Sequence, residues 1–406
     1  MKRVRKPKQI PLTPAMEAMM DELETLARNP VVEAAYNDAI AHVQPVLYQG
    51  AQEVSGHEKN PWSGQPITYL IEYFRDWFTY LPSPTGGLGK IVPFTYFYLN
   101  NQRAFYFLNQ FESRSGDAKK YTKEIFDWTV RFVMLRGEFM DSTASAVVIS
   151  AWKKAIGKEW DDYLVPKGGY KTFNEFFTRR LNMKKNPRPI AHPEDDSILT
   201  ASADCEINFI ESELTLDTRL DVKSRTLNVR ELLNNSKYAK YFKGGSAISC
   251  VLMPNNYHHY HAPVTGAIVE SDIVDGIYNG IMDGEDWFND FNVGESTTDF
   301  SIFEDFHRAY FIYKTKNHGY VAMIPVGLNT ISSIHPSVVN KKSTLVPPAR
   351  GKRKAGKPVP VQKGDEVGHF AYGGSLNILL FQKGVFSSVN VLMGQRIGTL
   401  SSPTKL

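Results

Sequence analysis

The spacing of apolar residues changes along the chain, and this change is the strongest constraint on the fold. In Pro14–Ala27 and Lys123–Met140, apolar residues recur at every third or fourth position, which predicts amphipathic helices. From about Asp196 onward, short apolar runs such as Ala247–Met253 and Ile378–Phe381 are separated by Gly, Asn and Asp. Such runs between turn-forming residues are typical of β-strands. The sequence therefore predicts an α+β protein, with a helical N-terminal domain followed by a mainly antiparallel β domain.

We place the domain boundary near residue 165, which gives a helical domain of residues 1–165 and a second domain of residues 166–406. Ser142–Gly157 continues the helical pattern of the first domain, and Val229–Tyr241 is expected to be a helical insert in the second. The aromatic-rich stretches Tyr69–Tyr80 and Phe94–Phe111 have rings at helical spacing. Such stripes more often form core than a ligand pocket, so we interpret them as the core of the helical domain.

Composition and charge exclude several classes of protein. The chain has 406 residues, of which 42% are hydrophobic, and its net charge is +4; it is long enough for two domains and has no charge excess for binding nucleic acid. No apolar stretch approaches the roughly 18 residues that a membrane helix needs. The basic segment Met1–Lys8 is not followed by an apolar region, so we expect no secretory signal. The two cysteines provide no disulfide framework, and we expect a cytoplasmic protein.

One tripeptide near the C-terminus suggests that the chain cuts itself. Gly373-Gly374-Ser375 stands directly before an apolar run, and glycine leaves its carbonyl open to attack by the serine hydroxyl that follows it. An N→O acyl shift and β-elimination would cleave the chain between Gly374 and Ser375 and convert residue 375 into a pyruvoyl group. The same tripeptide occurs at Gly244-Gly245-Ser246. Because Gly-Gly-Ser usually forms a turn, we interpret Ser246 as an ordinary strand entrance.

Two other segments provide partners for the reactive serine. Three histidines lie within four positions in Asn256–Gly266, and Asp204 follows a stretch of small residues. A serine is a weak nucleophile until a histidine accepts its proton, and a carboxylate can hold that histidine in the correct tautomer. The alternative is a zinc site, but His258 and His261 are not followed by a second pair of ligands at suitable spacing, and the two cysteines are isolated. We therefore predict no metal.

The sequence from about residue 173 onward resembles the phosphatidylserine decarboxylase family, whose members depend on a pyruvoyl group. The resemblance is found in five blocks in the same order: Phe173–Leu181 with Asn186–Ile190, Ser202–Cys205, Tyr257–Gly266, Val326–Ile334 and Lys363–Phe370. Two positions differ. Cys205 stands where the family usually has glycine, and Leu376 stands where its membrane-lipid enzymes commonly have threonine after the cleavage serine. We expect Leu376 to alter a wall of the substrate pocket.

The resemblance implies a role for each candidate residue. The family's Asp-His-Ser triad falls on Asp204, His261 and Ser375, and its second histidine, associated with decarboxylation, falls on His258. The pyruvoyl group made from Ser375 would be the cofactor, and the substrate amine would form a Schiff base with it. Residues 1–165 have no counterpart in the short lipid enzymes. They resemble the N-terminal extension of a soluble branch that includes fungal tryptophan decarboxylase.

These features favour a free L-amino acid, for instance an aromatic one such as tryptophan, as the substrate. The first alternative is phosphatidylserine, converted to phosphatidylethanolamine by an enzyme whose basic segment Arg350–Lys357 contacts the membrane. The second is a non-catalytic, carrier-like or binding β module, because His261–Gly266 resembles the hairpins of lipoyl and biotinyl carriers. As partners we expect a small-molecule amino acid and no nucleic acid. Membrane contact is possible but not favoured, the cleaved chains would stay associated, and a homo-oligomer is possible.

Overall fold

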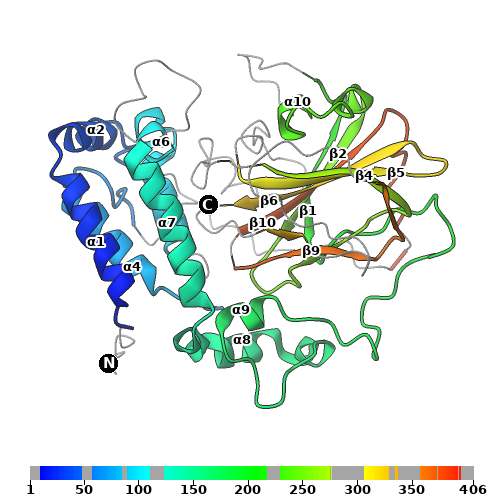
Figure 1. Cartoon of the computed structure of the whole chain (residues 1–406), viewed down its shortest axis with the longest axis horizontal. Coiled ribbons are helices and arrows are strands. Elements are labelled where there is room, and N and C mark those ends of the chain that lie inside the picture. Colours follow the sequence, from blue (N-terminus) through cyan, green and yellow to red (C-terminus); the bar gives the residue numbers. More distant parts are fainter. Residues whose placement is uncertain are drawn as a thin grey trace.

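Helices and strands occupy different parts of the molecule (Figure 1). The computed structural model describes residues 10–47, 57–84, 89–109, 123–216, 229–274, 276, 306–328, 334–336, 357–372, 374–391 and 393–394. In this part of the chain, the N-terminal helices lie beside a domain of antiparallel strands, and the region around α8 and α9 lies below both. The predicted α+β class is confirmed. None of the helices within these ranges is long and apolar enough to cross a membrane.

The helical part begins where the sequence places its first cap. The helices are α1 (Pro14–Ala27), α2 (Pro30–Ala41), α4 (Ile67–Phe78), α5 (Ile91–Tyr98), α6 (Gln102–Leu108), α7 (Lys123–Met140), α8 (Ile149–Ile156) and α9 (Phe173–Phe177), with 3₁₀ helices at Thr143–Val148 and Gly157–Asp162. Thr13 accepts a hydrogen bond from the backbone N–H of Met16, and Pro14 occupies the first turn. Both features stabilise a helix start, because the first N–H groups of a helix have no partner within it.

The predicted helix at Ser142–Gly157 is divided into a 3₁₀ segment and α8. The hydroxyl of Ser145 donates to the carbonyls of Met140 and Ser142 and accepts a hydrogen bond from the N–H of Phe173. Side-chain bonds of this kind compete with the regular helical pattern. They favour a 3₁₀ segment before α8, which the spacing of apolar residues does not predict.

Aromatic side chains form the core of the helical part. Trp62, Trp77 and Trp128 are each at most 1% exposed, and rings from α4, α5 and α7 contact one another edge-on. Burying such rings removes large apolar areas from water, and their mutual contacts add further stabilisation. The prediction that the aromatic stripes form core is confirmed for the described residues, whereas Gln110 and Phe111 at the end of the second stripe lie outside them. This core continues through Phe173, Phe176 and Phe177 and also includes Tyr372 from the C-terminal part of the chain.

The strands form two antiparallel sheets. A seven-stranded sheet has the order β1-β2-β10-β6-β5-β4-β8, and a three-stranded sheet has the order β3-β9-β7. Their strands are β1 (Glu206–Ser212), β2 (Ser246–Leu252), β3 (His259–His261), β4 (Gly266–Val274), β5 (Arg308–Lys314), β6 (Tyr320–Leu328), β7 (Ile334–Pro336), β8 (Val359–Val361), β9 (Glu366–Phe370) and β10 (Gly374–Phe381). Every pairing between these strands is antiparallel.

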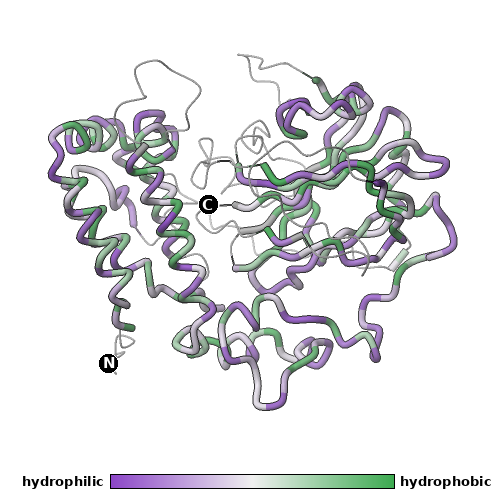
Figure 2. Tube along the Cα trace, in the orientation of Figure 1, coloured by the Kyte–Doolittle hydropathy of each residue, from purple (hydrophilic) through white to green (hydrophobic). Residues whose placement is uncertain are grey.

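The side chains of β10 alternate between two apolar cores. Leu376, Ile378 and Leu380 pack into one core with residues of α10 (Val229–Leu232). Leu379 and Phe381 pack into the other, between the two sheets. A strand covered on both faces is apolar throughout, which explains the uninterrupted apolar run in the sequence. Figure 2 shows hydrophobic residues along the central strands, whereas α1 and α7 alternate between hydrophilic and hydrophobic residues.

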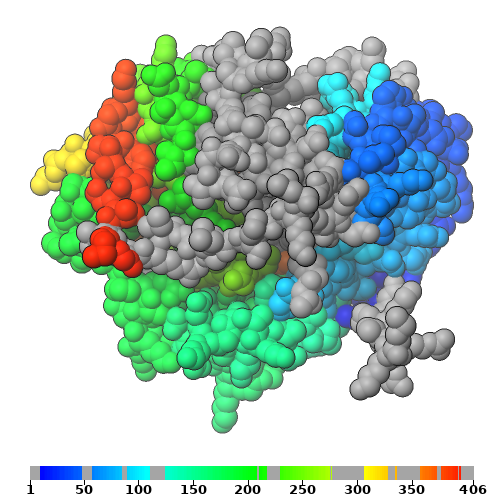
Figure 3. Space-filling view, turned by 180° about the vertical axis from the view of Figure 1, so that it is seen from behind, coloured from blue at the N-terminus to red at the C-terminus, as the bar shows by residue number. Residues whose placement is uncertain are grey.

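The predicted helical insert at Val229–Tyr241 is also divided. It contains the short helix α10 and a 3₁₀ helix at Ala239–Phe242. Asn234 and Asn235 between them have φ values of 49° and 58°, a left-handed conformation that ends a right-handed helix. Seen from behind, the molecule again shows the helical part in blue and the strands in green to red on opposite sides (Figure 3).

The buried side chain of Arg136 on α7 provides a test of the helical packing. Its guanidinium donates to the carbonyls of Trp77 and Phe78, which end α4, and of Tyr80, which follows it. We expect Arg136→Met to lower the free energy of unfolding by about 2–4 kcal/mol, because buried carbonyls lose their donors. Urea unfolding of a chain that also has Ser375→Ala, so that one polypeptide unfolds, measures this loss.

The matched control is Arg131→Met on the same helix. Arg131 pairs with Glu22 at the surface, and exposed pairs contribute at most about 1 kcal/mol. Equal losses in the two variants would show that the bonds of Arg136 to the end of α4 contribute no special stability.

Candidate active site

The predicted cleavage bond lies at the start of a central strand. Gly374 pairs with Leu328, and Ser375 pairs with Leu252 on β2 and with Gly327 on β6. The structure describes the backbone of these two residues but not the side chain of Ser375. Because β10 is hydrogen-bonded on both sides, the position of the Gly374–Ser375 bond is fixed relative to both neighbouring strands.

The second Gly-Gly-Ser lies at the opposite end of the same strand pair. β2 begins at Ser246, whose partner is Phe381, the last residue of β10. A Cβ on Gly245 would lie 1.9 Å from the carbonyl oxygen of Phe381, and Gly244 has a φ of 69°. Both glycines are therefore required by the close packing of the backbone and by the left-handed turn. Ser246 is confirmed as a strand entrance.

His258 is buried beside the segment that leads into the cleavage bond. Its ring stacks on Phe177 with 3.7 Å between ring centroids. Phe177 also contacts the ring of Tyr372, at 5.4 Å, and Tyr372 lies three residues before Ser375 in the chain. The short helix α9 thus connects His258 to the approach to β10.

A second set of contacts places His258 near the same end of the strand. The backbones of Met253 and Pro254 hydrogen-bond to the ring of His258. Met253 directly follows Leu252, which is the pairing partner of Ser375. The side chain of His258 therefore contacts residues next to the cleavage position on β2 and before β10. The described side-chain contacts of His261 are with Gly364 and Tyr257.

Arg179 holds the loop that precedes the histidines. It is 1% exposed and donates to the carbonyl oxygens of Asn255 and Asn256 at 2.6 and 2.9 Å. Burial lowers the pKa of His258 well below its ordinary value, and the charge of Arg179 lowers it further. His258 is therefore neutral at physiological pH. The sequence indicates Arg179 only as part of the first resembling block, without a role.

His261 is held in one tautomer by a backbone carbonyl. Its Nδ1 lies 2.8 Å from the carbonyl oxygen of Gly364, and because a carbonyl only accepts, Nδ1 must donate. In the neutral ring, Nε2 then accepts a hydrogen bond from the hydroxyl of Tyr257, at 3.2 Å. Burial lowers the pKa of His261. The ring thus has an acceptor nitrogen, as a general base requires, but in this structure Tyr257 occupies it.

The carboxylate of Asp204 is bound by an arginine. Arg188 donates three hydrogen bonds to it, at 2.8, 3.0 and 3.1 Å, and also contacts Asp162. Asp204 lies close enough to His261 for its charge to oppose the lowering of the pKa of that histidine. The structure therefore places Asp204 within electrostatic influence of His261 but shows the hydrogen bonds of Asp204 going to Arg188. Arg188 lies in the block Asn186–Ile190, and nothing in the sequence alone indicates this pairing.

Ser202 connects these groups to β10. The N–H of His261 donates to the carbonyl of Ser202 at 2.7 Å, and the amide of Asn377 donates to the hydroxyl of Ser202 at 3.4 Å. Asn377 is fully buried and lies two residues after Ser375. The segments that contain Asp204, His258, His261 and Ser375 are thus neighbours. Their individual catalytic roles stay predictions.

Leu376 does not have the environment that the sequence suggests. It is 0% exposed and packs in an apolar core with Ile378, Ile324 and Leu380. Its side chain therefore fills the interior of the β domain. Its difference from threonine gives no information about the substrate pocket.

Comparison with known proteins now identifies the family. The family model for phosphatidylserine decarboxylase matches residues 173–399, which is more than half of the chain. The chain therefore belongs to the phosphatidylserine decarboxylase family. Residues 1–172 lie outside the matched region.

Curated relatives cover the chain to different extents. The phosphatidylserine decarboxylase proenzyme of Clostridium novyi is 28% identical over 281 residues, covering 66% of this chain and 84% of the relative. Proenzyme 3 of Schizosaccharomyces pombe is 29% identical over 283 residues, covering 66% of this chain but 26% of the relative. Proenzyme 2 of Komagataella phaffii is 29% identical over 249 residues, covering 61% and 22% respectively. The match therefore spans about a quarter of the two yeast proteins.

The roles that the family resemblance implies predict different effects for the two histidines. We expect His261→Ala and Asp204→Asn to slow self-cleavage by roughly 100-fold or more, because they remove the base or its charge partner. His258→Ala should still cleave, at least in part, but should decarboxylate poorly. A time course of full-length chain on denaturing gels, followed by a carbon dioxide assay of the matured fraction, separates the two effects.

The control for this series is His192→Ala, which alters an exposed histidine and should leave both steps unchanged. Equal cleavage defects in the His258 and His261 variants would refute the proposed division of roles.

Proposed function

We propose that the chain is the proenzyme of a pyruvoyl-dependent decarboxylase that acts on phosphatidylserine. The observation that supports this most strongly is the position of the Gly374–Ser375 bond. It lies at the start of the central strand β10, next to the segments that contain Asp204, His258 and His261. Membership of the family supports the reaction, and the names of the relatives, which are phosphatidylserine decarboxylase proenzymes, support the substrate.

Self-cleavage would begin when the hydroxyl oxygen of Ser375 adds to the carbonyl carbon of Gly374 and gives its proton to a base. The C–N bond then breaks, the nitrogen of residue 375 takes up a proton, and an ester joins the two residues. Removal of the Cα proton of residue 375 expels Gly374 as a carboxylate and leaves a dehydroalanine. This residue takes up water and loses ammonia to give a pyruvoyl group, which supplies a carbonyl that can withdraw electrons from the α-carbon of an amine-bearing substrate.

The surrounding residues fit this chemistry. His261 presents Nε2 as an acceptor because its Nδ1–H is bound to the carbonyl of Gly364. The hydrogen bond from Tyr257 to Nε2 must break before His261 accepts the proton of the serine. His258 is neutral, buried and next to the start of β10, where it can hold or deliver a proton in a site that excludes water.

The strand pairing explains how the two products of cleavage would stay together. After cleavage, β10 belongs to a short chain of residues 375–406, while its neighbours β2 and β6 belong to the long chain of residues 1–374. The hydrogen bonds of β10 to β2 and β6 continue to its last residue, Phe381. Its apolar side chains fill two cores, so separating the chains would expose both.

A free amino acid such as tryptophan is the second candidate substrate. Most of the helical part, residues 1–172, lies outside the family match, and the aromatic core of the helical part includes Tyr372, three residues before Ser375. A domain that packs against this segment could restrict the site to a small substrate in the cytoplasm. The basic segment Arg350–Lys357, which would favour a membrane, lies outside the described residues except for its last member.

Carbon dioxide release distinguishes the substrates. With purified mature protein, we expect release from phosphatidylserine vesicles and little from tryptophan. Replacing Arg350, Lys352, Arg353, Lys354 and Lys357 with glutamine should weaken turnover of vesicles at low salt, because each charge contributes about 1 kcal/mol near an anionic surface. Added salt should also lower the turnover of vesicles by the wild-type protein, because it screens the same charges.

Ser375→Ala is the control and should release carbon dioxide from neither substrate. Turnover of tryptophan alone would favour the second candidate. Release from neither substrate by a fully cleaved protein would contradict both.

A further inference from the structure

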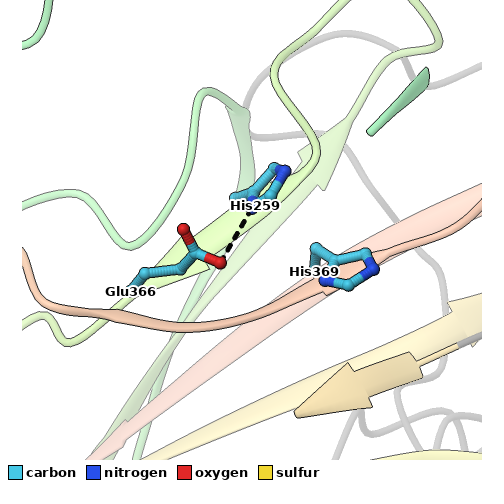
Figure 4. A group of neighbouring side chains, drawn as sticks. All are labelled: His259, Glu366 and His369. Carbon is cyan, nitrogen blue, oxygen red and sulfur yellow. Dashed lines mark ion pairs between the residues drawn. The ribbon is translucent and has the colours of Figure 1, made fainter. Parts of the chain in front are cut away.

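Three side chains from the facing strands β3 and β9 gather at one point. His259 on β3 lies opposite His369 on β9, and Glu366 begins β9 (Figure 4). One potential ligand atom from each of the three lies within 4.8 Å of the other two. The sequence suggests no metal because it directs attention to His258 and His261, whereas Glu366 and His369 are far from His259 along the chain.

The tautomer of His259 makes its contact with Glu366 unusual. Nε2 of His259 lies 2.9 Å from the carbonyl oxygen of Thr178 and must therefore donate its proton to it. In the neutral ring, Nδ1 then has a lone pair, and this lone pair faces Oε1 of Glu366 at 3.1 Å. His259 is 1% exposed. Two electron-rich atoms do not remain this close in a buried place unless a cation lies between them.

The cation is either a proton on His259 or a metal ion. A proton on Nδ1 of His259 would form a hydrogen bond with Glu366, but it would give His369 no partner. Nδ1 of His369 is buried, and it has no hydrogen-bond partner among the residues described. Buried polar atoms without partners are rare and require an explanation. A metal ion accounts for all three groups together.

The surroundings also match those of a metal site. Histidine ligands usually donate their second nitrogen to a carbonyl or carboxylate, as His259 does to Thr178. Ligating carboxylates are themselves hydrogen-bonded, and Arg180 donates to Oε2 of Glu366 at 2.8 Å and to Oε1 at 3.3 Å. The positive charge of Arg180 opposes a cation, but its side chain is 61% exposed, so water screens it.

We propose that His259, Glu366 and His369 bind a divalent transition metal, with Zn²⁺ the expected ion. Two histidines and a glutamate form a known zinc ligand set that leaves a fourth position for water, and imidazole also suits iron, copper and nickel. In a tetrahedral site with ligands at about 2.0–2.2 Å, neighbouring ligand atoms are about 3.4 Å apart. His259 and Glu366 already have nearly this separation, and a potential ligand nitrogen of His369 lies within 4.8 Å of both.

A metal ion at this site would link β3, which contains His261, to β9, which precedes the cleavage bond in the chain. β3 contains His261, and β9 is followed by Ala371–Gly373 and then by the cleavage bond. The ring of Tyr257 stacks on His259 with 4.9 Å between centroids, and its hydroxyl binds His261. By fixing His259, the ion would stabilise the side chain that occupies Nε2 of His261. This site does not depend on the proposed substrate.

The test uses untagged, full-length protein purified without chelators. Elemental analysis should find one zinc per chain, or one Zn²⁺ should bind after dialysis against EDTA. Co²⁺ should give the intense visible absorption of a tetrahedral site. His259→Gln and His369→Gln should each weaken Zn²⁺ binding by at least ~10-fold, since changes even in the outer shell have this effect.

His335→Gln is the matched control. His335 stacks on His369, with 4.9 Å between centroids, but is not a member of the ligand group, so this variant should keep its affinity. Circular dichroism of each variant reports on folding. Zn²⁺ that fails to bind the wild-type protein would overturn the proposal and leave a protonated His259 paired with Glu366. Equal affinity in all variants would overturn it too, by placing the metal elsewhere.

Discussion

The pairing of β10 with β2 and β6 is the constraint on which the rest of the structure depends. Ser375 is bound between Leu252 and Gly327, so the bond before it lies at a fixed place at the end of the sheet. The two candidate histidines reach β10 through different segments. His258 does so through the loop after β2, and His261 does so through Ser202 and Asn377. A strand buried on both faces provides the rigidity that a catalytic site needs.

The helical part of the chain contributes to this site through aromatic packing. Phe177 contacts both His258 and Tyr372, and Arg136 lies near the ring of Tyr372 while it binds the end of α4. The helices therefore support the segment that precedes the cleavage bond. Phe177 lies inside the family match, but Arg136 lies outside it, so its contacts with Tyr372 and α4 give the N-terminal residues a structural role in addition to any effect on substrate choice.

Periodicity in the sequence predicts the long elements well. The bounds of α1 and α7 agree with the helical pattern, and the interiors of β2 and β10 agree with their apolar runs. The short strands β3, β7 and β9 were not predicted, because three to five residues rich in histidine, glycine and valine have no clear period. The candidate residues could be named from motifs. Their partners could not, because Arg188, Gly364 and Thr178 meet Asp204, His261 and His259 only in the folded chain.

The central claim is that the bond between Gly374 and Ser375 breaks and leaves a pyruvoyl group. Intact mass spectrometry of the purified protein under denaturing conditions tests this most directly. We expect a long chain ending at Gly374 and a short chain of residues 375–406 whose mass is lower, by the mass of ammonia, than that of a chain beginning with serine. A single chain of 406 residues after prolonged incubation, or a short chain with an ordinary N-terminal serine, would contradict the account.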